Sequence, residues 1–383
     1  MKKIIICVII SISLNVFFNI SYCTEENEII NMQKDTLNIS DFLKEAEEYT
    51  EESMPNIDLN ELLSVAISGN IDNGKLLNMF SKLIGNEVIE SISIISSIIV
   101  IIVIHGILKS IGDGLENKSV AQITYYIQYI LLVTVIMKNF SDIIKMIKET
   151  IENLVGLMNS LIPILITLIL TTGNIASATI IQPIILFMIT FIGNFITTII
   201  VPIVLVSTAL GIISQISDRI QIDKLAKFLK SSTVWILGVI LTVFVGITSL
   251  EGNLSSSIDG VTAKTTKAAV SSFIPVVGKI LGDAVDTVMG CSVILKNALG
   301  IIGVIIIIGI CIVPIIKLAI LMGVYYLTAA LCQPIADGKI IKLLSHMGDT
   351  FKMLFAILTT VSVMLIIGVT LVVKISNTGV MYS

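Results

Sequence analysis

The sequence predicts an all-α polytopic membrane protein, with about seven to nine transmembrane helices after a signal peptide and with amphipathic helices at the membrane interface. Between Asn153 and Ser217 there are 65 consecutive residues without Asp, Glu, Lys, Arg or His. A hydrocarbon core about 30 Å thick is crossed by roughly 20 helical residues, so this run suffices for about three crossings. The 383 residues are 55% hydrophobic and 14% charged, with a mean hydropathy of +0.99, whereas typical soluble domains have about 25% charged residues.

The amino terminus predicts a secretory signal peptide over residues 1–23. Lys2 and Lys3 form the basic region, Ile4–Leu14 is apolar, and Ser21-Tyr22-Cys23 offers small residues at the two positions that a signal peptidase reads. An uncleaved membrane anchor is the alternative. If the peptide is cleaved, the mature amino terminus is extracytoplasmic.

An acidic extracytoplasmic segment is expected over residues 24–90. Ten carboxylates between Glu25 and Glu52 face only Lys34 and Lys44, and the positive-inside rule does not hold back anionic segments from export. Two short amphipathic helices are predicted here. Their apolar stripes consist of Phe42, Leu43, Ala46 and Tyr49 in the first, and Leu59, Leu62, Leu63, Ala66 and Ile67 in the second. These helices pack on the membrane part or on a partner, or they form a solvated linker.

A glycine-containing stretch in this segment resembles a phosphate-binding loop but does not predict a nucleotide site. In Gly69–Leu76, Leu76 stands where the motif needs a hydroxyl to hold magnesium, and no convincing strand precedes the loop. The chain is therefore predicted to be neither an ATPase nor any other enzyme, and to need no cofactor.

The remaining apolar runs are placed by the charges that separate them. The first helix group, residues 91–250, contains expected spans at Ser91–Leu108, Val120–Met137, Leu154–Thr172, Thr179–Thr198, Ile199–Ile216 and Ser232–Leu250. The second group, residues 297–374, contains Asn297–Ile316, Leu318–Ala336 and Met353–Val373, followed by a tail over 375–383. Ile199–Ile216 could be half of a hairpin, and the first two spans of the second group require a turn near Pro314 and Lys317. Asp142–Glu152 and Asp218–Lys230 are expected to lie on the membrane surface.

Lysine and arginine positions give an orientation for nine spans. Arg219, Lys224, Lys227, Lys230 and Lys374 would face the cytoplasm, as the positive-inside rule prefers. Lys138, Lys145 and Lys148 would fall outside, which counts against the scheme.

Four prolines predict helix breaks and a weak internal repeat. Pro163 and Pro183 stand 20 residues apart, as do Pro314 and Pro334, and the two pairs are offset by 151 residues. Transporters often carry repeats with interrupted helices at equivalent places. Chance matching in an isoleucine-rich chain is the alternative.

Residues 251–296 form neither a clean span nor a soluble domain, and we expect an amphipathic or re-entrant segment. Small and acidic residues recur on one face of the helix predicted there: Gly278, Gly282, Asp286 and Gly290, with Asp283 beside them. Small residues four apart permit close helix contact. These five residues are the candidates for helix packing or for lining a polar path, and a surface helix is the alternative.

Two stretches resemble the stage III sporulation protein AE family. The first comprises Phe273–Gly278, Asp283–Val288 and Leu295–Gly300, and the second is Tyr325–Asp337. The resemblance implies a multi-pass protein of the mother-cell membrane around the forespore. It also implies partners: other proteins of the same stage III sporulation operon, including a secretion-type ATPase, and a forespore-side channel protein. The family offers no catalytic residues to carry over.

Residues and resemblance together predict a membrane component, permease-like or scaffold, of a sporulation channel or secretion-type complex needed for late forespore development. The alternative is an autonomous secondary transporter of a small solute, for which His105 and Lys317 are the ionisable candidates within or between apolar runs. A net charge of −4 argues against nucleic acid as a partner, and the five cysteines have no spacing typical of a metal site or a disulfide framework.

Overall fold

The computed structural model describes residues 27–50, 58–68, 118–172, 174–215, 222–273, 277–334 and 336–375, with short helical pieces at 96, 99–100, 102–104 and 107. The predicted signal peptide, the loop Gly69–Leu76, His105 and most of the expected span Ser91–Leu108 lie outside these residues.

Every element in the described part of the chain is helical, which confirms the all-α prediction. Three short helices come first, and long helices follow. The elements are α2 (Asn27–Thr36), α3 (Ile39–Thr50), α4 (Leu59–Ser68), α6 (Lys118–Thr171), α7 (Ile175–Phe195), the π-helix η1 (Ile196–Ile200), α8 (Val201–Ser214), α9 (Asp223–Phe273), α10 (Val277–Cys332) and α11 (Gly338–Ile375).

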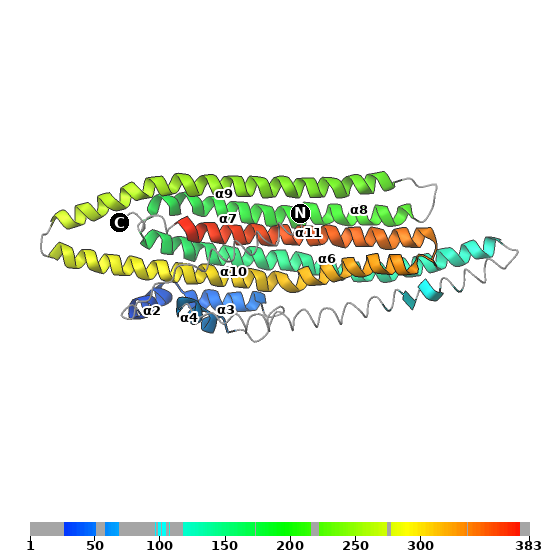
Figure 1. Ribbon diagram of the computed structural model, residues 1–383, viewed down its shortest axis with the longest axis horizontal. Helices are drawn as coiled ribbons and strands as arrows, with labels where there is room; N and C mark the ends of the chain where they lie inside the picture. The colour runs from blue at the N-terminus through cyan, green and yellow to red at the C-terminus, as the bar shows by residue number, and fades with distance from the viewer. Residues whose placement is uncertain are drawn as a thin grey trace.

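The long helices form one elongated bundle, with α2, α3 and α4 along its side (Figure 1). Five stretches of the described residues are long and apolar enough to cross a membrane: Tyr129–Thr171, Ala178–Ser214, Asp223–Thr248, Thr287–Cys332 and Gly338–Lys374. The longest has 46 residues, or about 69 Å of helix, which is more than twice the thickness of a bilayer core. The expected number of seven to nine spans is not confirmed.

The predicted surface helix Asp142–Glu152 is instead the middle of α6, which runs without a break from Lys118 to Thr171. Charged residues in this stretch occupy one face, while Ile143, Ile147 and Ile151 on the other face are buried in the bundle. An amphipathic helix can bury its apolar face against neighbouring helices as well as against lipid, and here it packs in the bundle.

Two expected turns are also absent. The helical rod α7–η1–α8 passes through Ile199, and α10 passes through Pro314 and Lys317. Residues 223–230, expected on the membrane surface, are the first turns of α9, and residues 251–273 and 277–296 extend α9 and α10.

The four prolines do not occupy equivalent places. Pro163, Pro183 and Pro314 lie inside helices that continue through them, whereas Pro334 lies in the turn before α11. An offset of 151 residues thus superposes a helix interior on a turn, and the predicted repeat is wrong at that point. The hydroxyl of Thr167 donates a hydrogen bond of 2.8 Å to the carbonyl of Pro163, the bond to the preceding turn that threonine commonly makes inside a helix.

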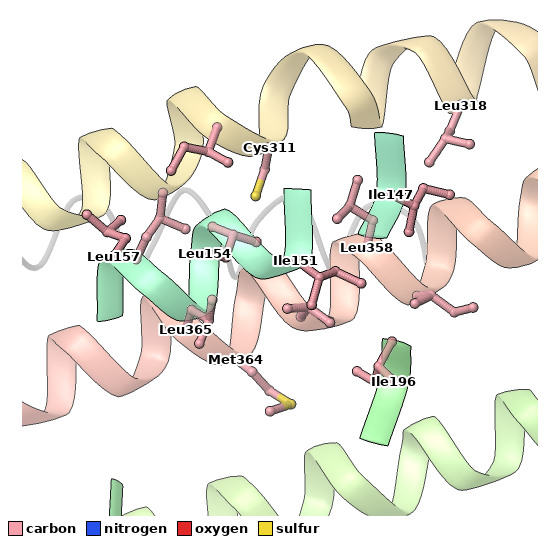
Figure 2. Packing of buried hydrophobic residues seen from close by; sticks show 14 of the residues in the cluster. Ile147, Ile151, Leu154, Leu157, Ile196, Cys311, Leu318, Leu358, Met364 and Leu365 are labelled. Atoms are coloured by element: carbon pink, nitrogen blue, oxygen red, sulfur yellow. The ribbon is translucent and has the colours of Figure 1, made fainter. Parts of the chain in front are cut away.

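Branched side chains from several helices fill the core (Figure 2). The α6 side of this core consists of Ile147, Ile151, Leu154 and Leu157. These side chains face Cys311 and Leu318 of α10, and Leu358, Met364 and Leu365 of α11. The ring of Phe351 lies 6.2 Å from that of Phe140 and 5.1 Å from that of Tyr325. These contacts fix the height of α6, α10 and α11 relative to one another.

The direction of α11 corrects one part of the predicted orientation. Its first turns lie beside Lys230 near the start of α9, and it ends where Val373 packs against Gly300 in the first half of α10 (Figure 1). Lys374 and Lys224 therefore lie at opposite ends of the bundle, whereas the expected orientation has both on the cytoplasmic side. Lys138, two residues from Phe140, lies toward the same end as Lys224, because Phe140 packs on Phe351 and the neighbouring Thr350 contacts Lys230.

The five-residue π-helix η1 joins α7 to α8 without a turn. Ile196 and Ile200 are buried, and the hydroxyl of Thr197 donates to the carbonyls of Gly193 and Asn194 at 3.1 and 3.2 Å. A π-turn accommodates one residue more than an α-turn, so η1 sets how α8 is rotated relative to α7.

Candidate functional site

The predicted small-residue face is placed in the first half of α10. Gly278, Gly282, Asp283 and Asp286 are helical, but their side chains lie outside the described part of the structure. Gly290 is half-buried, and a Cβ built on it would meet no heavy atom within 4 Å. Helix packing or path lining by this face stays a prediction.

A polar cluster that the sequence reading missed lies where α8, α9 and α11 meet. The ammonium of Lys230 lies 3.3 Å from Nδ1 of His346, and it donates to the carbonyl oxygen of His346 at 3.1 Å and to the hydroxyl of Thr350 at 3.0 Å. The hydroxyls of Thr350 and Thr208 are 3.2 Å apart, and both residues are fully buried. Lys230 thus joins α9 to α11, and Thr350 extends the cluster to α8.

The ring of His346 rests directly on Gly211 of α8. A Cβ built at position 211 would overlap Cε1 and Nε2 of this ring, so only glycine fits without a rearrangement. Nε2 of His346 is buried against α8, close to the backbone of Thr208.

Charged groups surround this cluster toward the end of the bundle. The hydroxyl of Tyr326 donates to Oδ1 of Asp349 at 2.6 Å, and Lys227 pairs with Asp223 at 2.7 Å. Asp223 and Lys227 are substantially exposed, so their pair contributes little stability. The cluster thus brings the ammonium of Lys230 within 3.3 Å of the His346 imidazole, close to these exposed charged groups. Among the described residues, no three His, Cys, Asp or Glu come together as metal ligands.

His346 was overlooked because charged residues flank it on both sides. The last span was expected to begin at Met353, yet buried Ile340, Leu343, Leu344 and Met347 continue its apolar face upstream. That periodicity could have been followed in the sequence. The pairing of His346 with Lys230 could not, because 116 residues separate them. Lys317, one of the predicted candidates, is half-buried in α10.

At the other end, α2, α3 and α4 pack against the outside of α6 and α10 (Figure 1). The predicted stripes supply the contact: Phe42, Leu43, Ala46, Leu59, Leu63 and Ala66 are all at most 4% exposed. This confirms packing on the membrane part and excludes a solvated linker for these two helices. Asn38, with φ of 49°, turns α2 into α3, and Asp58 caps α4 by accepting from the amides of Asn60 and Glu61 at 2.8 and 3.2 Å.

Specific polar contacts fix the register of this docked segment. Gln33 donates to the hydroxyl of Ser292 at 2.8 Å, and Ser160 donates to Glu45 at 2.9 Å. The ring of Tyr49 lies over Gly156, where an added Cβ would be 2.8 Å from the tyrosine oxygen. Burial raises the pKa of Tyr49 above its ordinary value, and the hydrogen bond that it donates to Glu45 acts in the same direction.

Comparison with known proteins identifies the family. The model of the family described as stage III sporulation protein AE matches residues 57–376. Stage III sporulation protein AE of Bacillus subtilis (strain 168) is 32% identical over 303 residues, which cover 79% of this chain and 76% of that relative. No solved structure matches the chain. The chain therefore belongs to the stage III sporulation protein AE family.

Proposed function

We propose that this protein is the membrane component, permease-like or scaffold, of a sporulation channel or secretion-type complex that links mother cell and forespore and is needed for late forespore development. Family membership over residues 57–376 is the observation that carries the proposal. The five long apolar helices supply the membrane part that such a component needs. The proposal assigns the chain no catalytic reaction.

The proposed partners are other proteins of the stage III sporulation operon, among them a secretion-type ATPase, and a channel protein on the forespore side. The proposed location is the mother-cell membrane around the forespore, with the amino terminus extracytoplasmic after signal cleavage. The distribution of charge supports this orientation, because Lys224, Lys227, Lys339 and Lys342 lie at the bundle end away from the acidic α3.

Deletion of the gene, followed by microscopy of sporulating cells, tests the proposal. Arrest after engulfment, with small or collapsed forespores that are restored by the wild-type gene, is the expected result. Normal spores in the deletion strain would reject it.

A secondary transporter is the second candidate, and the Lys230–His346 cluster is the observation that favours it. Ionisable groups within membrane helices commonly mark proton or substrate routes. The purified protein in liposomes with an imposed pH gradient should then move protons or solute without any partner, and Lys230→Met should abolish this movement while Lys227→Met preserves it. If liposomes that contain the wild-type protein move neither protons nor solute, the secondary transporter is rejected and the component of a complex remains.

A further inference from the structure

Contacts across the bundle mark two heights along its axis. At the first height, Phe140 of α6 packs on Phe351 of α11. The neighbouring Thr350 contacts Thr208 of α8 and Lys230 of α9.

At the second height, Gly193 of α7 packs on Val155 of α6, and a Cβ on Gly368 of α11 would lie 3.4 Å from Phe244 of α9. For α10, contacts of Tyr325 with Phe351 and of Gly303 with Leu161 give the corresponding heights.

Among the long helices that the structure describes, the segment between these two heights is almost free of charge on all except α6. The stretches 194–207 of α7–η1–α8, 231–243 of α9 and 353–367 of α11 contain no charged residue, and 304–324 of α10 contains only Lys317. The corresponding stretch of α6, residues 141–155, contains Asp142, Lys145, Lys148, Glu149 and Glu152. About 15 residues of helix span roughly 22 Å, so these charges lie at the height where the other helices look like membrane interior.

The charges of α6 point away from the bundle. The side chains of Lys145 and Glu149 are 78% and 54% exposed and pair at 3.5 Å, while Ile144 and Ile147 on the opposite side are buried. Such an i,i+4 pair contributes only about 0.2–0.5 kcal/mol in water. It cannot offset the cost of several charged side chains in hydrocarbon, which is at least about 2.5 kcal/mol for each at the bilayer centre.

The exposed faces of α7 and α9 have the reverse character. Phe187 and Phe191 on α7 and Trp235 and Val239 on α9 are between 42% and 71% exposed. The rings of Phe187, Phe191 and Phe195 stack at 5.8 and 6.0 Å. These faces suit contact with lipid acyl chains, and the face of α6 does not.

We infer that the charged face of α6 lines a water-filled passage at membrane height, which a second copy of this chain completes. The inference rests on the proposed function as a permease-like component and names the surface that would form the path. A second copy fits because Lys145 and Lys148, together with Lys138 just before this stretch, balance Asp142, Glu149 and Glu152, so that two such faces carry no net repulsion. The charged face of α6 continues to Ser160, whose hydroxyl donates a hydrogen bond to Glu45 of α3.

Cysteine labelling in native membranes tests the inference. Single variants Lys145→Cys and Glu149→Cys on α6 are compared with Ile199→Cys and Val239→Cys, two exposed apolar positions at matched height. A membrane-impermeant maleimide is applied to permeabilised cells, so that it reaches both sides of the membrane. Cys291, Cys311 and Cys332 are buried thiols, and the parent protein gives the background. We expect labelling at the α6 positions to be at least about tenfold faster than at the controls, because reactivity follows thiolate exposure to water.

Two labelling results would overturn the passage. Equal labelling of all four positions would place this height outside the membrane, and no labelling at α6 would show that protein or lipid covers the face. For the second copy, a short bifunctional maleimide should give a covalent dimer with Glu149→Cys but not with Val239→Cys. Labelling without a dimer would overturn that part. None of these measurements uses spores. The proposed passage can therefore be rejected while the sporulation role stands, and the deletion experiment can reject the sporulation role independently.

Discussion

The two ends of the bundle both place an aromatic ring over a glycine, yet they are held by different chemistry. At one end His346 lies on Gly211, and Lys230 ties α9 to α11 in a buried polar cluster. At the other end Tyr49 lies on Gly156, and short helices cover α6 and α10 from outside with an apolar stripe. The first contact cannot open without separating long helices and exposing a charged cluster. The second can open while the bundle stays intact.

The largest effect is expected for Gly211→Leu, because the new side chain would occupy the position of the His346 ring. Overpacking of this kind typically costs 1–3 kcal/mol, and with a rigid ring in the way we expect about 3 kcal/mol or more. Spore titre should fall and less protein should accumulate in the membrane. Gly246→Leu on α9 is the control, since a Cβ there meets nothing within 4 Å. Equal protein levels and titres for the two variants would show that the end held by Lys230 tolerates separation.

The next effect is expected for Lys230→Met, which removes the donor to His346 and Thr350. Hydrogen bonds to charged groups contribute about 1.5–3 kcal/mol. The apparent Tm of the detergent-solubilised protein should therefore decrease clearly. Lys227→Met, one turn earlier, removes only an exposed ion pair and should change the Tm little. If both substitutions have the same small effect, the cluster does not hold α9 to α11.

A smaller effect on the bundle is expected for Gly156→Leu, which displaces Tyr49 and so releases α3. The variant should keep the Tm of the bundle while a protease removes residues 27–68 several times faster than from the wild type. Gly323→Leu on α10, where a Cβ meets nothing within 4 Å, is the control. Unchanged proteolysis in Gly156→Leu would contradict a docking contact at this glycine.

The smallest effect is expected for Tyr49→Phe, which keeps the ring over Gly156 and removes only the hydrogen bond to Glu45. A net loss of about 0.5–1.5 kcal/mol or less is expected for this exposed bond. Proteolytic release of the segment should increase slightly and remain below that of Gly156→Leu. A release as fast as in Gly156→Leu would mean that the hydroxyl, rather than the ring, holds the segment.

Local periodicity accounts for what could be predicted from the sequence. The stripes through Phe42 and Leu59 predicted which side of α3 and α4 is buried, because spacings of three and four residues determine a helical face. Charge was a poorer guide in α6, where Asp142–Glu152 is predicted to be a surface helix although Ile147 and Ile151 continue the buried face. The contact between Lys230 and His346 depends on how α9 and α11 pack, which no local pattern records.

Because of the π-helix η1, the packing of α8 depends on the exact number of residues in the α7–η1–α8 rod. If one residue were deleted between Ile196 and Ile200, the stretch could close into an ordinary α-turn, and everything after it would rotate by about 100° and retract by about 1.5 Å. Gly211 would then turn away from His346, and a residue with a side chain would face the imidazole instead. Natural relatives are therefore expected to tolerate insertions or deletions in the turn after Thr171 more readily than within these five residues.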